Sequence, residues 1–161
     1  IKYIATMKTS ATTQQHPSPI TSILSFLETA SALERRLDRI LSSMKGISFS
    51  EYRLLSALAQ ANATGFPKVE LANAVGLTPS AITRALKPLE KIGYIATQRN
   101  ERDARQSLAL ITTQGRELLQ DAQNILDDTL RELPINSLSP QKVLAFQQRL
   151  DEFKGVGKTP L

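Results

Sequence analysis

The sequence of 161 residues contains no cysteine and a single histidine, His16. The lack of cysteine excludes a disulfide framework, thiol chemistry and cysteine-bound zinc, and one histidine cannot form a histidine metal cluster. His16 lies beside Pro17 in a polar segment, so an exposed loop position explains it better than a catalytic role. We also find no nucleophile elbow or paired-carboxylate site, so the sequence predicts neither an enzyme nor a bound cofactor.

Long apolar runs are missing as well, and aromatic residues make up only 5% of the chain, with no tryptophan. No apolar run approaches the roughly 18 residues that a membrane span requires. The N-terminus lacks the basic and apolar regions of a signal peptide, so we expect a cytoplasmic protein without a membrane partner. The formal net charge of +5 favours a polyanionic partner such as nucleic acid, although charge alone is weak support.

The two ends of the chain differ in composition from the rest. Residues 1–17 are rich in Thr, Ser and Gln, and we interpret them as a flexible arm or a tag remnant. Because the chain begins with Ile rather than Met, Met7 is a candidate native start. Residues 155–161 form a C-terminal tail that superficially resembles a phosphate-binding loop. The spacing excludes that function, because the glycine required five residues before Gly157 is Glu152.

A pair of predicted helices joined by a tight turn is the most informative part of the sequence. Residues 68–75 have the pattern of a short helix, and Gly76 suits the left-handed position that follows a helix. Thr78 is a favoured N-cap and Pro79 a favoured first helical residue, so a second helix begins there. Together with the small Ala72 where the helices would cross, this spacing predicts a helix-turn-helix.

The outward face of the second helix carries hydroxyl and basic side chains, whereas Ile82 and Leu86 fall on its apolar face. Small hydroxyl residues let a helix approach base edges, Arg can bind guanine through two hydrogen bonds, and Lys reaches phosphate. A solvated face, which would carry Lys and Glu in alternation, is the alternative explanation. Pro88 lies inside this helix and predicts a kink. The candidate DNA-binding residues are Ser80, Thr83, Arg84 and Lys87.

After Gly93 the apolar residues alternate, which predicts two strands over residues 94–98 and 107–112. The connection over residues 99–105 carries several arginines and would form the charged tip of a hairpin, or wing. Such a tip is usually only exposed to solvent. Because this one follows a helix-turn-helix directly, its composition favours contact with phosphate or the minor groove. The candidate wing contacts are Arg102, Asp103 and Arg105.

Cap residues and breakers define the remaining boundaries. Ser48, with Glu51 three residues later, forms a capping box for a helix over residues 49–61. Residues 62–66 then read as a turn. Thr113 is the predicted N-cap of a later helix that extends to residue 133.

Long amphipathic helices are predicted outside the helix-turn-helix, the first over residues 20–45 and the last from Pro140. Both carry apolar residues at steps of three and four, the pattern of a helix–helix seam. The first helix has apolar residues on two of its faces, whereas a helix that packs only on its own domain needs one apolar face. We therefore infer that part of its surface contacts another chain. A long core helix in a monomer is the alternative. The seam residues include Ile23, Phe26, Leu37, Met44, Val143, Phe146, Leu150 and Phe153.

The predicted fold is therefore mainly α with a small β-hairpin wing. Residues 48–112 form a winged helix-turn-helix domain, and residues 18–47 and 113–154 form a helical dimerisation region.

The order of elements resembles the MarR family of winged helix-turn-helix transcription regulators over residues 20–153. The resemblance implies a homodimer whose recognition helices enter successive major grooves of a palindromic site in double-stranded DNA. It also implies that Arg105 is the wing arginine and that Asp103 orients it through an ion pair. Ala104, where many members have a further Arg, and Pro88 depart from the family pattern. The matching positions are Leu71-Ala72, Leu77, Thr83-Arg84, Leu89-Glu90, Gly93, Asp103, Arg105, Ile111-Thr112 and Gly115.

The resemblance further places a small-molecule effector where the dimer helices meet the helix-turn-helix. The candidate lining residues are Phe49, Tyr52 and Arg53, because an aromatic body beside a cation suits a small aromatic acid. As an alternative, Phe49 and Tyr52 are core residues. The predicted function is a dimeric, sequence-specific DNA-binding transcriptional regulator, a repressor released by such a ligand. The alternative function is a winged-helix module that binds acidic protein partners through its basic face.

Overall fold

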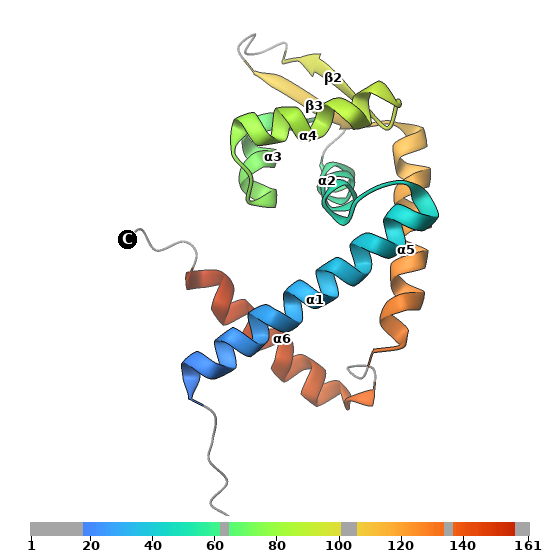
Figure 1. The fold of residues 1–161 in the computed structure, drawn as a ribbon. Coiled ribbons are helices and arrows are strands. Elements are labelled where there is room, and N and C mark those ends of the chain that lie inside the picture. Colours follow the sequence, from blue (N-terminus) through green and yellow to red (C-terminus); the bar gives the residue numbers. More distant parts are fainter. Residues whose placement is uncertain (1–17, 62–64, 101–105, 134–136, 157–161) are drawn as a thin grey trace, which may run out of the picture. The chain divides into compact units, whose positions relative to one another are not determined.

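A computed structural model describes residues 18–61, 65–100, 106–133 and 137–156, with side chains described up to residue 152. By its internal contacts the chain forms two units, residues 1–35 and 36–161, so α1 contributes to both. The predicted fold class is confirmed, since helices dominate and the strands form one small sheet. The elements are α1 (Pro19–Lys45), α2 (Phe49–Ala59), β1 (Phe66–Pro67), α3 (Lys68–Val75), α4 (Pro79–Lys91), β2 (Ile95–Arg99), β3 (Ser107–Ile111), α5 (Thr113–Arg131) and α6 (Pro140–Val156) (Figure 1).

The sheet is antiparallel, with β3 between β1 and β2. β2 pairs with β3 along its full length, and on the other side Phe66 lies opposite Ala109 and Pro67 opposite Leu108. The prediction of a turn over residues 62–66 was therefore wrong at Phe66. A two-residue strand is too short to show alternation, and Pro67 is tolerated there because β1 is an edge strand.

The core of the second unit is aliphatic and centres on α2, which contacts α3, α5 and β3. In α4 the buried residues are Ile82, Leu86 and Leu89, as their helical spacing predicted. Buried hydrophobic side chains also come from α1, α2, α3, α5 and the strands. They include Leu37, Leu41, Leu54, Leu55, Leu58, Leu71, Ala72, Leu108, Ala109, Leu119, Ala122 and Leu126.

The start of α2 is both capped and tied to α1. The predicted capping box is confirmed, since Ser48 Oγ accepts from the Glu51 amide at 3.1 Å and the Ser48 amide donates to the Glu51 carboxylate at 2.7 Å. In addition, the Phe49 amide donates to Asp38 Oδ1 of α1 at 2.8 Å. These bonds satisfy amides that a helix start otherwise leaves without partners. α2 then ends at Ala59 rather than at residue 61.

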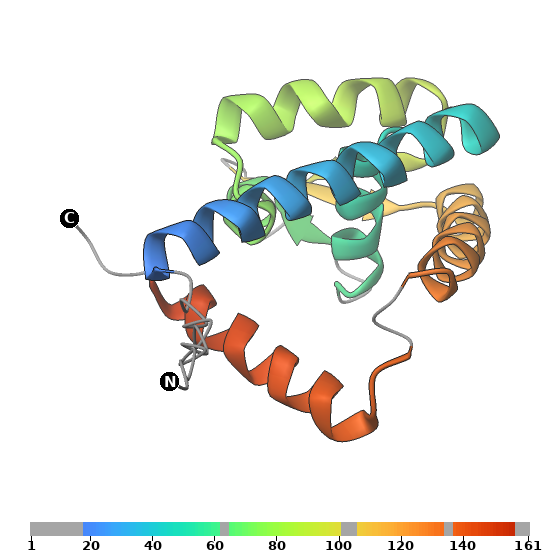
Figure 2. The same ribbon diagram turned by 60° about the horizontal axis from the view of Figure 1, so that its bottom comes forward.

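The start of α5 lies one residue from the predicted cap. Thr112, not Thr113, is the N-cap, and its Oγ1 accepts from the Gly115 amide at 3.1 Å. Both residues offer the same hydroxyl, and the extended backbone needed at an N-cap is found at Thr112. α5 follows directly on the strand β3 (Figure 2). α5 ends at Arg131, before the predicted residue 133.

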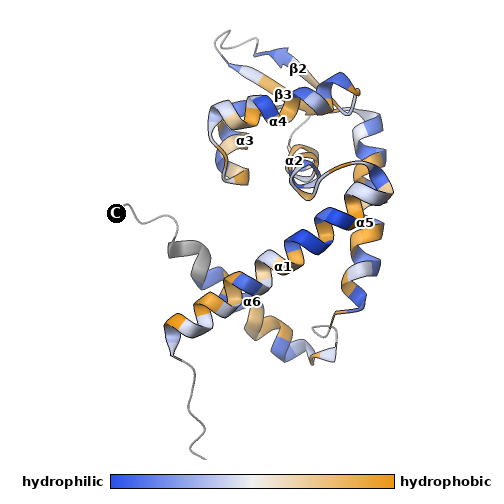
Figure 3. Ribbon diagram, viewed as in Figure 1, coloured by the Kyte–Doolittle hydropathy of each residue, from blue (hydrophilic) through white to orange (hydrophobic). Residues whose placement is uncertain are grey.

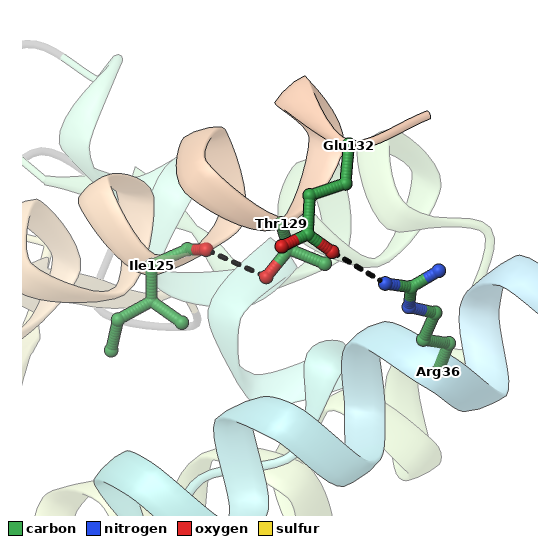
Figure 4. A network of polar contacts seen from close by, with 4 residues as sticks. All are labelled: Arg36, Ile125, Thr129 and Glu132. Carbon is green, nitrogen blue, oxygen red and sulfur yellow. Dashed lines mark hydrogen bonds and ion pairs between the residues drawn. The ribbon is translucent and has the colours of Figure 1, made fainter. Parts of the chain in front are cut away.

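Two ion pairs join the second half of α1 to α5. Arg36 contacts Glu132, the C-cap of α5, at 3.1 Å, next to the Thr129 hydroxyl that donates to the Ile125 carbonyl (Figure 4). Lys45 pairs with Asp121, which lies earlier in α5. The order of the pairs shows that the two helices run antiparallel. Since the partners are partly exposed, each pair contributes only about 0–1 kcal/mol to stability.

The first part of α1 and α6 contain many hydrophobic residues (Figure 3). Several large apolar side chains of these segments are exposed. By contrast Leu37, predicted as a seam residue, is only 6% exposed and belongs to the core of its own chain. No helix in the described part of the chain is long and apolar enough to cross a membrane. The exposed residues are Ile20, Ile23, Leu24, Phe26 and Leu27 of α1, at 41–68%, and Val143, Leu144 and Phe146 of α6, at 40–60%.

Candidate nucleic-acid interface

α3 and α4 meet at a tight turn that has the geometry of a helix-turn-helix (Figure 1). Gly76 is left-handed, with φ 72° and ψ 32°, as predicted. The Leu77 amide donates to the Ala72 carbonyl at 2.8 Å and the Gly76 amide to the Asn73 carbonyl at 3.3 Å, which closes the end of α3. A Cβ at Gly76 would meet nothing within 4 Å, so the backbone conformation rather than space requires glycine.

α4 begins as the sequence predicted. Thr78 is its N-cap, with Oγ1 accepting from the Ala81 amide at 3.2 Å, and Pro79 is its first residue. The Ser80 hydroxyl lies 3.3 Å from Thr78 Oγ1. The first turn of α4 is thereby fixed and presents small hydroxyl groups to solvent.

The outward face of α4 brings the four predicted residues together, and all four are exposed: Ser80, Thr83, Arg84 and Lys87. The Thr83 hydroxyl donates to the Pro79 carbonyl at 3.0 Å, so its lone pairs and methyl group remain for an outside partner. Among the described residues, none forms an ion pair with Arg84 or Lys87. These two cations are therefore available to an anion such as phosphate.

The wing residues Arg102, Asp103 and Arg105 lie outside the described residues. The base of the hairpin is well defined, because Asn100 and Gln106 bond through their backbones at 3.0 Å and through their side chains at 3.2 Å. At the end of β2, Arg99 is an exposed basic residue that the sequence analysis did not single out. The sequence predicted Arg99 as part of the exposed hairpin tip, whereas the structure places it at the end of β2, where it is also exposed.

The candidate ligand residues lie on the first two turns of α2. The rings of Phe49 and Tyr52 stack with their centroids 5.8 Å apart, and both side chains are half-buried, whereas Arg53 is exposed. Burial raises the pKa of Tyr52, a hydrogen bond with Gln123 of α5 lowers it, and the charge of Asp127 raises it again. The structure thus brings the two aromatic rings together and joins Tyr52 to α5.

Comparison with known proteins agrees with this arrangement. Residues 47–107 match the model of the MarR family. The chain is also 30% identical over 99 residues to an uncharacterized HTH-type transcriptional regulator, YdgJ, of Bacillus subtilis. This match covers 62% of the chain and 59% of YdgJ, which is less than two thirds of the length of that relative.

Solved structures resemble the chain over most of its length. Sco3205, a MarR family transcriptional regulator from Streptomyces coelicolor solved in complex with DNA, is 26% identical with a TM-score of 0.78, covering 91% of this chain and 92% of its own. MepR of S. aureus, also solved with DNA, is 20% identical with a TM-score of 0.75, covering 84% and 98%, and supports the fold alone. Residues 47–107 therefore match the MarR family, and the chain has the winged helix-turn-helix fold of the solved regulators that it resembles.

Proposed function

We propose that this protein is a dimeric, sequence-specific DNA-binding transcriptional regulator. The observation that carries the proposal is the exposed hydroxyl and basic face of α4, which follows directly on the helix-turn-helix turn. Support comes from Sco3205, a relative over nine tenths of the chain that was solved in complex with DNA.

In this proposal α4 enters the major groove of DNA. Its 13 residues span about 20 Å, enough to follow the groove across a half-site. Arg84 would bind the edge of a guanine through two hydrogen bonds, and Lys87 would contact phosphate. Thr83 would accept a hydrogen bond or contact a thymine methyl group, because its own proton is used within the helix. Arg102 and Arg105 of the wing would contact the backbone or minor groove.

Binding to duplex DNA tests the proposal. Duplexes recovered from a genomic pool at fixed salt should share a palindromic sequence, because a twofold dimer reads two half-sites. The affinity for that sequence should fall steeply with salt, by a logarithmic slope of about −0.9 for each phosphate neutralised. The alternative, a module for acidic protein partners, predicts no enriched duplex. Failure to enrich any sequence from the pool would refute the proposal.

The exposed apolar residues of α1 and α6 support a homodimer, since large apolar patches on a protein surface mark association sites. Leu24→Asp tests this, because Leu24 is 55% exposed and does not support the core of its own chain. The variant should lose dimerisation, since an unpaired charge in an apolar interface costs several kcal/mol. Ser31→Asp, which adds the same charge at an exposed polar position of α1, is the matched control. Sedimentation at micromolar concentration measures the result, and a monomeric wild-type chain would contradict the proposal.

We further propose that the protein represses transcription and that a small aromatic acid releases it from DNA. The stacked Phe49 and Tyr52 rings next to the exposed Arg53 support this, because an aromatic acid needs an apolar surface and a cation. Titration of salicylate-like acids against the protein–DNA complex should lower the affinity for DNA. Unchanged affinity at millimolar acid would contradict this class of ligand.

A further inference from the structure

A single threonine hydroxyl fastens the start of α5 to the residues that follow α4. Thr112 Oγ1 donates to the Gly93 carbonyl at 2.7 Å and accepts from the Gly115 amide at 3.1 Å. The Thr112 amide donates to the Tyr94 carbonyl at 3.1 Å. The hydroxyl that caps α5 therefore also holds the turn at the end of α4.

Gly115 brings the two backbones into direct contact. A Cβ at this buried position would lie 2.1 Å from the Tyr94 carbonyl oxygen and 2.8 Å from the side chain of Ile111. Real Cβ atoms are never so close to another atom, so any larger residue must push α5 and Tyr94 apart. Glycine weakens a helix and has no conformational use at this position, where its φ is not positive. The close approach is therefore what requires it.

The two residues held by Thr112, Gly93 and Tyr94, follow the C-cap of α4 and bond back to its last turn. Gly93 has φ 84°, its amide donates to the Glu90 carbonyl at 3.0 Å, and the Tyr94 amide donates to the Leu89 carbonyl at 2.9 Å. Gly93 and Tyr94 are thus hydrogen-bonded to the last turn of α4 on one side and to Thr112, the N-cap of α5, on the other. Along the chain the two helices are separated by the whole hairpin, but this joint connects them directly.

We propose that Thr112 and Gly115 are positioning residues that fix the direction of the recognition helix α4 relative to α5. In a dimer held together by the long helices, this direction sets the separation of the two recognition helices and hence the half-site spacing that the protein accepts. The proposal rests on the proposed function, since it requires a dimer bound to two half-sites. A small rotation at the joint is amplified along α4, which is about 20 Å long.

DNA duplexes of different spacing test the joint. The duplexes carry the two half-sites at the selected spacing, the same half-sites with one base pair inserted, or one half-site alone. Thr112→Val keeps the side-chain shape and removes both hydroxyl bonds, and Thr112→Ser keeps them. The valine variant should bind the selected spacing up to about tenfold more weakly, because one or two hydrogen bonds no longer hold α4 in the direction that this spacing requires, and it should bind the single half-site like wild type. Its discrimination against the inserted base pair should shrink, while the serine variant should behave as wild type.

A distance measurement without DNA provides a second test. Because the chain has no cysteine, Lys91→Cys at the exposed end of α4 gives one spin-label site per protomer. The label-to-label distance in the dimer should be narrowly distributed in wild type and in Thr112→Ser. The distribution should broaden or shift in Thr112→Val. It should also do so in Gly115→Ala, because the added methyl group forces α5 and Tyr94 apart.

The outcomes separate the two proposals. A wild-type chain that neither binds a palindrome nor gives a distance between protomers would refute the proposed function, and this joint with it. The wild type could instead bind a palindrome and give a distance between protomers. If the folded Thr112→Val and Gly115→Ala variants then kept the same spacing preference and the same distance distribution, only the proposed role of Thr112 and Gly115 would be refuted.

Discussion

Replacement of Arg84 by alanine should weaken DNA binding without weakening the fold. The side chain is exposed, and no described residue forms an ion pair with it, so its removal leaves no buried group without a partner. The free energy of unfolding should therefore stay within about 0.5 kcal/mol of wild type. The substitution then affects only the protein–DNA complex, so the change in DNA affinity directly measures the contact that Arg84 makes.

The magnitude follows from the contact that an outward arginine on α4 can make. Loss of a bidentate pair with guanine costs about 1–3 kcal/mol, or roughly 5- to 150-fold in affinity. The loss should be large on the selected duplex and small on a duplex in which that guanine is already replaced. Arg84→Lys keeps the charge but not the paired geometry, so it should recover phosphate attraction without recovering the base preference.

The assay compares the selected duplex, a series of single-position variants and unrelated DNA at several salt concentrations. Arg131→Ala is the matched control, because it removes the same charge from the exposed surface of α5, where its ion pair with Asp128 is worth little. The control should change affinity slightly and equally on every duplex. If Arg84→Ala also lost the same affinity on every duplex, its role in reading bases would be wrong.

Other substitutions test the wing and α2. Arg105→Ala should weaken binding on all sequences and reduce the salt slope by about one, while Asp103→Ala should lower affinity with a slope near wild type; salt titrations on two unrelated duplexes measure both. Asp38→Ala should lower the free energy of unfolding, measured in urea, by about 1–2 kcal/mol, because the Phe49 amide loses its acceptor. Asp38→Asn keeps an acceptor oxygen and should recover most of this loss. Equal losses in the two variants would contradict the capping role of Asp38. Burial raises the pKa of Tyr52 above its ordinary value of 10.0, so the unfolded state releases its proton first and stability should fall as pH rises from 10 through the folded pKa. Unfolding at pH 8 to 11 should show this loss, and Tyr52→Phe should remove the part due to Tyr52.

Local signals in the sequence predicted the helix-turn-helix and its caps. The left-handed Gly76 and the N-cap Thr78 act on backbone groups a few residues away, so sequence spacing alone identifies them. Non-local features were missed. Phe66 becomes a strand only because β3 is present beside it, and the periodicity that marks Leu37 as apolar does not say whether its partner is its own chain or another.

The candidate interface was predictable to the extent that helical periodicity fixes it. A period of 3.6 residues is enough to place Arg84 and Lys87 on one exposed face, although it cannot show which bases they contact. The Asp38–Phe49 bond was not predictable, because it joins two helices through residues that have no sequence relation to each other.

The two-residue strand β1 closes the helix-turn-helix into a ring of hydrogen bonds. β1 directly precedes α3, β2 follows α4, and both pair with β3, so the two helices are anchored to the same strand at both ends. Amides of β3 should therefore exchange with solvent together with those of α4, because neither element opens unless the other does. Unfolding of α4 alone is therefore an unfavourable way to regulate DNA binding in this arrangement. An effector would have to turn α3, α4 and the three strands together, and the recognition helix would stay intact in the protein released from DNA.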